Sequence, residues 1–194
     1  MYEYIKGTVT GLNPAFAVVE TGGMAYILQI SLNTFSKLKE SEPCKLYAHL
    51  VVREDAHVLF GFAETEEREL FRQLITVSGV GANTARLILS SLTPQELVQA
   101  IGTADLALLQ RIKGIGAKTA QRIIVDLKDR VAKGLVSQEK LGFLHNTKKD
   151  EALSGLVILG FPKSLAEKAL TKILEKEGMD IPVETLIKMA LKIL

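Results

Sequence analysis

The pattern of hydrophobic and polar positions along the chain changes its period near residue 64. Before this point, short apolar-rich runs alternate with polar positions and are separated by turn residues such as Gly22 and Gly23. This alternation predicts strands, and the paired glycines predict a hairpin turn. The expected strands cover residues 4–10, 16–20, 24–30, 45–52 and 57–62, with a short helix or turn at 31–38. Five short strands with one helical insertion favour a small barrel of the OB type over a generic five-stranded barrel or sandwich.

Residues 64–133 have apolar positions at helical spacing, so this segment is expected to be all-helical with short glycine-containing turns. Acidic residues open the first of these helices, where negative charge complements the helix dipole. The run Thr93-Pro94-Gln95-Glu96 is a capping box with proline at the first helical position. It predicts that another helix begins there.

The last part of the chain is expected to form a separate helical domain. Polar and charged residues dominate 134–150, which predicts a flexible linker. Helical periodicity returns at 151–194 and predicts three helices. The first is expected to end at Gly160, the second to begin with a capping box from Ser164 to Glu167, and the third to cover 183–194. The chain is therefore expected to be an α+β protein with a five-stranded barrel at 1–63, an all-helical domain at 64–133 and a three-helix domain at 151–194.

An internal repeat lies within the central helical segment. Residues 74–85 read Leu-Ile-Thr-Val-Ser-Gly-Val-Gly-Ala-Asn-Thr-Ala, and residues 109–120 read Leu-Gln-Arg-Ile-Lys-Gly-Ile-Gly-Ala-Lys-Thr-Ala. The two copies align without gaps at an offset of 35 residues. Each copy has the pattern of a helix, a tight Gly-x-Gly turn and a second helix. The repeat therefore predicts two helix-hairpin-helix motifs, at 74–86 and 109–121.

The spacing in each copy is suited to binding a phosphate group. Glycine allows positive φ and leaves no Cβ in the way of a ligand, and the residue between the glycines can pack into the core. The next helix begins with free N–H groups at the positive end of its dipole, which together can hold a phosphate oxygen. The alternative is that each turn only links two packed helices. The expected DNA-contacting residues are Ser78, Gly79, Val80, Gly81, Asn83 and Thr84 around the first turn, and Lys113, Gly114, Ile115, Gly116, Lys118, Thr119 and Arg122 around the second.

Positive charge is concentrated around the second copy of the repeat. Residues 109–133 carry a net charge of +5, against +2 for the whole chain. A basic segment beside the glycine turns strengthens the interpretation as a phosphate-binding face. Asn83 stands in the first copy where the second has Lys118, so the first copy is expected to rely more on backbone N–H groups and Thr84.

Composition argues against several other classes of protein. Hydrophobic residues make up 47% of the chain, but no apolar run is long enough to span a membrane. The N-terminal residues lack the charge pattern of a secretory signal. Cys44 is the only cysteine, which excludes an intrachain disulfide and a cysteine-rich zinc site. A cytoplasmic protein without a membrane segment is expected.

No arrangement of residues typical of catalysis is found. The run Gly116-Ala117-Lys118-Thr119 lacks the Gly-Lys pair and the spacing of a P-loop, so ATP binding is not expected. The histidines His49, His57 and His145 have no metal-ligand spacing. Cys44 is expected to be a buried small residue rather than a nucleophile. The chain is therefore expected to need no metal or cofactor and to have no enzymatic activity of its own.

The two motifs resemble the tandem helix-hairpin-helix motifs of DNA repair proteins, and the whole chain is similar to the RuvA family of bacterial Holliday-junction-binding proteins. Val51-Val52-Arg53-Glu54-Asp55 and Leu59-Phe60-Gly61-Phe62 match the last barrel strands of that family. Leu159-Gly160-Phe161 and Glu184-Thr185-Leu186-Ile187 resemble its C-terminal domain. The resemblance spans essentially all 194 residues, although 134–150 contributes nothing to it.

The resemblance implies a DNA-binding subunit of a branch-migration complex in DNA recombination, DNA repair and the SOS response. Such subunits form a homotetramer, with an octamer on DNA as an alternative, that holds a four-way junction open. A partner ATPase, RuvB, then moves the duplex arms, and the RuvC resolvase is a further expected partner. By resemblance, 1–63 builds the tetramer, 64–133 binds DNA and 151–194 recruits the motor, with Leu159, Phe161 and Leu186 as candidate motor contacts.

Glu54 and Asp55 lie between the last two expected strands and have two interpretations. From the residues alone, a solvated turn is favoured, because Glu-Asp between two strands is ordinary. The resemblance instead implies an acidic pin near the symmetry axis of a tetramer, where it would repel phosphates and discourage ordinary duplex.

Two rival functions remain open. A DNA glycosylase of the helix-hairpin-helix class would use Lys118 as a catalytic lysine together with a later aspartate. No aspartate occurs between Asp129 and Asp150, and the cysteines of an iron–sulfur cluster are also absent. A non-specific DNA-binding accessory module is the other rival, and its affinity for a four-way junction compared with linear duplex would identify it.

Overall fold

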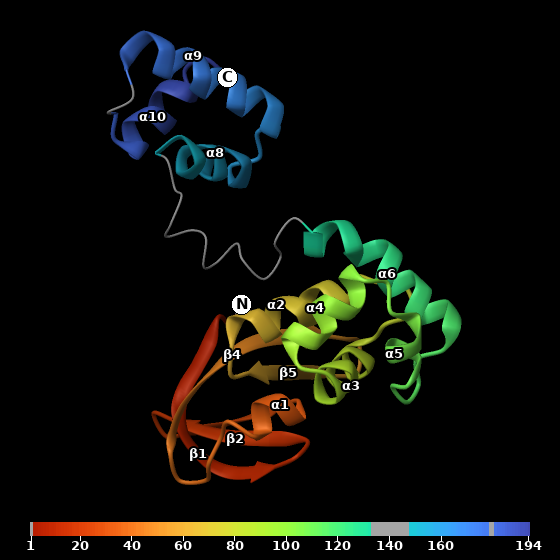
Figure 1. Cartoon of the computed structure of the whole chain (residues 1–194). Coiled ribbons are helices and arrows are strands. Elements are labelled where there is room, and N and C mark those ends of the chain that lie inside the picture. Colours follow the sequence, from red (N-terminus) through yellow and green to blue (C-terminus); the bar gives the residue numbers. More distant parts are fainter. Residues whose placement is uncertain (1, 133–147, 179–180) are drawn as a thin grey trace. The chain divides into compact units, whose positions relative to one another are not determined.

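The computed structural model describes residues 2–132, 148–178 and 181–194 (Figure 1). The chain divides into two compact units, one within residues 1–136 and one within 137–194. The barrel and the central helices both belong to the first unit. Of the expected linker at 134–150, residues 134–147 lie outside the described residues. Residues 148–150 are helical, so the expected linker extended too far into the second unit.

Five strands form the N-terminal barrel: β1 (Tyr4–Asn13), β2 (Phe16–Thr21), β3 (Met24–Gln29), β4 (Pro43–Val52) and β5 (His57–Phe62). The barrel is closed in the order β1-β2-β3-β5-β4. Its neighbouring strands are antiparallel except for β3 and β5, which are parallel. The short helix α1 (Leu32–Phe35) lies between β3 and β4 in the chain. The predicted OB-type barrel is confirmed, because a sandwich would leave the sheets open.

The central segment is all-helical, as predicted: α2 (Thr65–Leu74), α3 (Ala82–Ser91), α4 (Pro94–Gly102), α5 (Leu106–Gln110) and α6 (Ala117–Ala132). The capping box at the start of α4 is confirmed. The Thr93 hydroxyl accepts a hydrogen bond from the Glu96 N–H at 3.2 Å, and the Glu96 carboxylate accepts one from the Thr93 N–H at 2.8 Å. This exchange satisfies two donors that the helix itself leaves unbonded.

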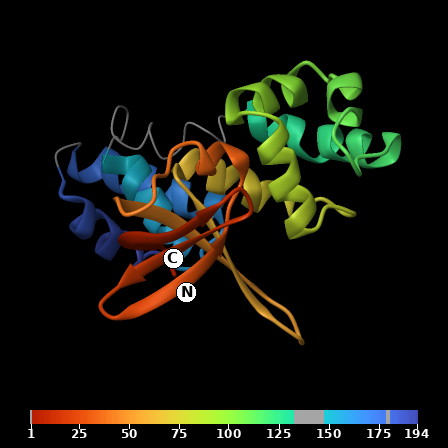
Figure 2. The same cartoon turned by 90° about the horizontal axis from the view of Figure 1, so that it is seen from below.

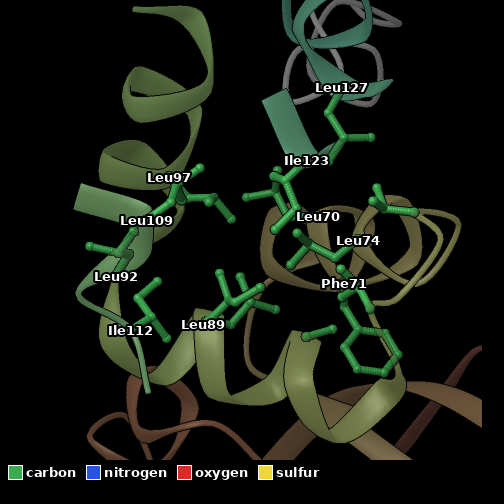
Figure 3. Packing of buried hydrophobic residues seen from close by; sticks show 14 of the residues in the cluster. Leu70, Phe71, Leu74, Leu89, Leu92, Leu97, Leu109, Ile112, Ile123 and Leu127 are labelled. Atoms are coloured by element: carbon green, nitrogen blue, oxygen red, sulfur yellow. The ribbon is translucent and has the colours of Figure 1, made fainter. Parts of the chain in front are cut away.

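The central helices and one end of the barrel share a single hydrophobic core. Figure 3 shows Leu70, Phe71 and Leu74 of α2 among apolar side chains from the other central helices. The Phe71 ring also lies 4.9 Å from the ring of Phe60 and 4.9 Å from that of Phe62, both on β5. Helix α2 thus joins the barrel to the other central helices.

A buried polar cluster reinforces this connection. The Glu67 carboxylate on α2 is 1% exposed and accepts hydrogen bonds from the hydroxyl groups of Ser31 and Thr34. Thr34 also accepts a hydrogen bond from the Ala63 N–H at 3.0 Å. Burial raises the pKa of the Glu67 carboxyl, and the hydrogen bonds from Ser31 and Thr34 oppose this shift. The cluster therefore holds α1 and the start of α2 together through groups that water does not reach.

The second unit contains α8 (Lys148–Ile158), α9 (Lys163–Glu177) and α10 (Val183–Ala190) around their own apolar core. Gly160, with φ +99°, ends α8 as predicted. The Phe161 N–H bonds to the Leu156 carbonyl at 3.1 Å and the Gly160 N–H to the Val157 carbonyl at 3.0 Å. This pair of bonds is the Schellman termination.

Two predicted helix boundaries in this unit are wrong. The capping box at Ser164 does not form, because α9 begins two residues earlier than the box predicts, with Pro162 as its N-cap and no side-chain cap. The fixed φ of proline already suits the entry to a helix, so the helix does not need Ser164 at that position. Helix α10 ends at Ala190 rather than residue 194. No helix in the described ranges is long and apolar enough to cross a membrane.

We predict that Glu67→Gln changes how stability depends on pH. The folded-state pKa of Glu67 is raised, so its contribution to stability is full below its unfolded pKa and is lost as pH rises through the folded pKa. The free energy of unfolding of the variant minus that of the wild type should therefore increase as pH rises from the unfolded pKa of Glu67 through its raised folded pKa. Urea unfolding followed by circular dichroism at several pH values measures this difference.

Glu96→Gln is the matched control, because the pKa shift of Glu96 has the opposite direction to that of Glu67. Hydrogen bonds from Thr93 lower the pKa of the Glu96 carboxyl, so its contribution is present above its unfolded pKa and is lost in acid. A Glu67→Gln variant whose stability runs parallel to wild type at every pH would contradict the role assigned to the buried carboxyl.

Candidate nucleic-acid interface

The two repeat copies form matching turns between helices. Hairpin 1 is defined as residues 74–86 and joins α2 to α3, and hairpin 2 is defined as residues 109–121 and joins α5 to α6. The first glycine of each pair has positive φ, +91° at Gly79 and +88° at Gly114. The Val80 N–H bonds to the Val77 carbonyl at 3.0 Å, and the Ile115 N–H bonds to the Ile112 carbonyl at 3.0 Å. The sequence repeat is therefore also a repeat of backbone conformation.

The residue between the glycines is buried in both turns. Val80 and Ile115 are each 5% exposed and belong to the core of the first unit. This confirms that they pack below the turns. Of the expected DNA-contacting residues, these two can offer a ligand only their backbone.

Each turn leads into a helix whose first N–H groups are open. The first bonded donor of α3 is the Ala85 N–H, which reaches the Gly81 carbonyl at 2.9 Å, and the Ala120 N–H reaches the Gly116 carbonyl at 2.9 Å in the same way. The N–H groups before these donors have no helical acceptor. Gly81 and Gly116 have no side chain to cap them, and a Cβ at either position would meet nothing within 4 Å. An anion can therefore approach the N–H groups closely.

The charged groups differ between the two hairpins. Lys113 and Lys118 are exposed beside hairpin 2. At the corresponding places hairpin 1 has Ser78 and Asn83, which are exposed but uncharged. The structure brings one predicted pair together: Arg122 on α6 donates to the Ser78 hydroxyl at 3.2 Å and to the Ser78 carbonyl oxygen at 3.4 Å.

A second arginine contact was not expected from the sequence. Arg130 on α6 donates to the Gln73 side chain at 2.5 Å and lies 3.4 Å from the Thr76 hydroxyl. Arg122 and Arg130 thus attach α6 to hairpin 1 and to the end of α2. Both contacts span more than forty residues, and no local pattern in the sequence points to them.

The β4–β5 turn carries the acidic pair. Figure 2 shows the end of this hairpin projecting from the barrel. The turn is closed by the Arg53 N–H, which bonds to the Ala56 carbonyl at 2.9 Å. Glu54 and Asp55 at its tip are exposed. Two carboxylates therefore lie at the end of an extended arm of the first unit.

The three candidate motor-contact residues lie in different surroundings. Leu159 is exposed, Phe161 is half-buried against the core of the second unit, and Leu186 is fully buried within it. Exposed aliphatic side chains instead gather at the end of α8. Ile158 is 85% exposed, and Val157 and Leu159 on either side are also exposed.

The candidate catalytic side chains occupy packing positions. His49 contacts the Phe71 ring at a centroid distance of 5.3 Å, and burial together with Arg72 and Arg68 lowers its pKa. Cys44 is half-buried, and burial raises the pKa of its thiol, which disfavours the reactive thiolate. His145 lies outside the described residues. Within the described ranges, no group of three or more histidine, cysteine or acidic side chains is placed to hold a metal ion.

Three family models match consecutive parts of the chain. They are the RuvA N terminal domain over residues 1–61, a SAM-like helix-hairpin-helix tandem over 71–129, and the RuvA C-terminal domain over 147–194.

Relatives match over nearly the full length. A protein of Christiangramia forsetii is 52% identical over 192 residues, covering 99% of each chain. One from Parabacteroides distasonis is 50% identical over 198 residues and covers 100% of each, and one from Bacteroides fragilis is 48% identical over 200 residues and covers 99% of each. All three are named Holliday junction branch migration complex subunit RuvA.

Substituting Gly114 should lower the stability of the chain, whereas substituting Gly116 should weaken its DNA binding. Gly114→Val places a side chain at φ +88°, which should cost at least about 1–2 kcal/mol of stability. The cause is backbone strain rather than a clash, since no atom lies within 4 Å of the added Cβ. Gly116→Ala lies outside the left-handed region, so its free energy of unfolding should stay within about 0.5 kcal/mol of wild type. Its methyl group should nevertheless weaken DNA binding by obstructing the N–H groups.

Urea unfolding and DNA titration of both variants separate these effects. Normal DNA binding by Gly116→Ala would show that no phosphate approaches the backbone there. Normal stability of Gly114→Val would show that the turn does not require glycine.

Proposed function

The chain belongs to the RuvA family, and on that premise we propose that it binds four-way DNA junctions and recruits a separate motor ATPase for branch migration. The observation that carries the proposal is the pair of matched hairpins, with open helix N-termini, in one compact unit with the acidic β4–β5 arm. Open N–H groups and nearby lysines attract phosphates, and exposed carboxylates repel them. The first unit thus contains both groups that attract phosphates and groups that repel them.

The proposed assembly is a homotetramer, with an octamer on DNA as the alternative. A junction has four arms, and a ring of four identical chains would present two hairpins to each arm. We assign this contact to residues 64–133, and assembly of the ring to the barrel at 1–63. The ring would act on chromosomal DNA in the cytoplasm, in recombination and repair. The chain itself supplies no catalysis in this proposal.

The acidic arm would supply selectivity for the junction. In a four-fold ring, four copies of Glu54 and Asp55 would gather where the arms diverge. Two unit charges about 4 Å apart interact by roughly 1 kcal/mol in water and by roughly 4 kcal/mol at an effective dielectric near 20. Several such terms would oppose a continuous duplex that crosses the centre, whereas an open junction leaves the centre free of phosphate.

The second unit is assigned to the partner proteins. The relatives' name describes a subunit of a complex, and a motor ATPase, RuvB, is the proposed partner of residues 151–194. The exposed group Val157, Ile158 and Leu159 suits an apolar contact, because large aliphatic side chains seldom cluster on a surface without a partner. Leu186 is fully buried, so its side chain is not offered to the partner in this proposal. RuvC is a further proposed partner, without an assigned surface.

The proposal is tested by titrating the chain with a synthetic four-way junction and with linear duplex. We expect tighter binding to the junction, and native mass measurement should give a tetramer that binds it. In Glu54→Gln with Asp55→Asn, both DNAs should bind more tightly, the duplex more so, and the ratio of the two affinities should fall. The change should shrink at high salt, because ions screen exposed charges over about 10 Å at 0.1 M.

Glu20→Gln with Glu40→Gln is the matched control, since it removes two exposed charges from the barrel away from the β4–β5 tip. It should leave the ratio near the wild-type value. Equal affinity of the wild type for junction and duplex would contradict junction recognition. If only the Glu54 and Asp55 variant keeps the wild-type ratio of junction to duplex affinity, the acidic tip is a solvated turn without a role in selectivity.

The motor assignment predicts that Ile158→Ser lowers stimulation of the RuvB ATPase several-fold and leaves junction affinity unchanged. The reason is the loss of an aliphatic side chain that is 85% exposed and therefore adds little to the fold. ATPase assays with junction DNA measure the effect. Ile158→Leu keeps the apolar surface and should behave as wild type. Full stimulation by Ile158→Ser would place the contact elsewhere in the unit.

A further inference from the structure

Hairpin 1 has no positive side chain of its own for a phosphate. Arg86 is the only cation within residues 74–86. Its guanidinium is committed to the barrel, where it donates to the Ala15 carbonyl at 2.7 Å and to the Gln29 side chain at 3.1 Å. Hairpin 2 has lysines where hairpin 1 has Ser78 and Asn83. Hairpin 1 therefore presents open N–H groups without an adjacent charge.

Arg122 reaches hairpin 1 from the helix that follows hairpin 2. One of its terminal nitrogens donates to Ser78, at 3.2 Å to the hydroxyl and at 3.4 Å to the carbonyl oxygen. The guanidinium is therefore held beside the first turn, where Ser78 and Gly79 are both exposed.

The contact runs in one direction only. The residue that corresponds to Arg122 in the first copy of the repeat is Leu87 on α3, which is 40% exposed and cannot donate a hydrogen bond. Lys113, at the place of Ser78, has its own charge and needs no such donor. The repeat is thus symmetric in backbone and asymmetric in charge.

We propose that Arg122, on the helix that follows hairpin 2, supplies the positive charge that hairpin 1 lacks. Its hydrogen bonds to Ser78 hold the guanidinium beside the first turn, and its remaining N–H groups donate to the phosphate that hairpin 1 holds. The inference rests on the proposed function and adds that the two hairpins are not independent: the first phosphate site is built from both copies of the repeat. The rival assignment pairs Arg122 with Lys118, one helical turn earlier, since both line the same shallow depression on α6.

A double-mutant cycle with Arg122→Gln and Asn83→Lys distinguishes the two assignments. Asn83→Lys gives hairpin 1 the lysine that hairpin 2 has at the same repeat position. Arg122→Gln should weaken junction binding roughly tenfold and lower the salt slope of log affinity by about 1, as expected for one lost phosphate contact. Adding Asn83→Lys to Arg122→Gln should restore most of the affinity and the slope, whereas in the wild type it should add much less.

Lys128→Gln is the control, because Lys128 is an exposed cation on α6 that lies about 9 Å further along the helix axis. The salt slope of log affinity for Lys128→Gln should stay close to that of the wild type. Arg122→Gln should melt within a few degrees of wild type, so lost binding would not reflect unfolding. Equal effects of Asn83→Lys in both backgrounds would overturn the inference and leave Arg122 to hairpin 2. Wild-type affinity in Arg122→Gln would also overturn it, with junction binding itself intact. Only failure of the wild type to prefer the junction would overturn the proposed function.

Discussion

The contact between α2 and the barrel fixes the geometry on which the proposed function depends. Phe71 packs against Phe60 and Phe62, with ring centroids 4.9 Å apart in both pairs, and Glu67 one turn earlier accepts hydrogen bonds from Ser31 and Thr34. A pivot of the helices on the barrel would expose the aromatic surface and separate a buried acid from its donors, and both changes are unfavourable. The acidic arm and the two glycine turns are therefore parts of one rigid body.

Duplication explains the paired hairpins, and divergence of the copies explains how they are held. The first glycine of each pair has a positive φ that favours glycine, and the second leaves the N–H groups of the next helix unobstructed. Val80 and Ile115 both pack into the core. The polar positions differ between the copies because their side chains contact different parts of the molecule. Arg86 in the first copy bonds to the barrel, whereas Arg122 in α6 bonds to the other hairpin. Hairpin 1 is thus bonded to the barrel through Arg86 and to α6 through Arg122.

The features that sequence predicted best are those encoded within a few neighbouring residues. The strand alternation, the glycine turns and the Thr93 capping box all belong to this class. Ser164 misled because Pro162, two residues earlier, also starts a helix, and the choice between them depends on packing. Arg122 and Ser78 are separated by 44 residues and Glu67 and Ser31 by 36, so no local pattern says that they meet. Glu67 does share the helical face of Leu70, Phe71 and Leu74, and that periodicity could have marked it as buried.

Recognition through backbone N–H groups and a few cations contains no information about base sequence, because phosphates are the same along any duplex. Selectivity must then come from the positions of the charges in space. Two sites that attract phosphate and one arm that repels it can distinguish DNA shapes only if the distances between them are fixed. Flexible attachment of the barrel would let the acidic arm move aside, and ordinary duplex would bind as well as a junction. The buried cluster around Phe71 and Glu67 contains none of the expected DNA-contacting residues, yet under the proposed function it would determine specificity as well as stability.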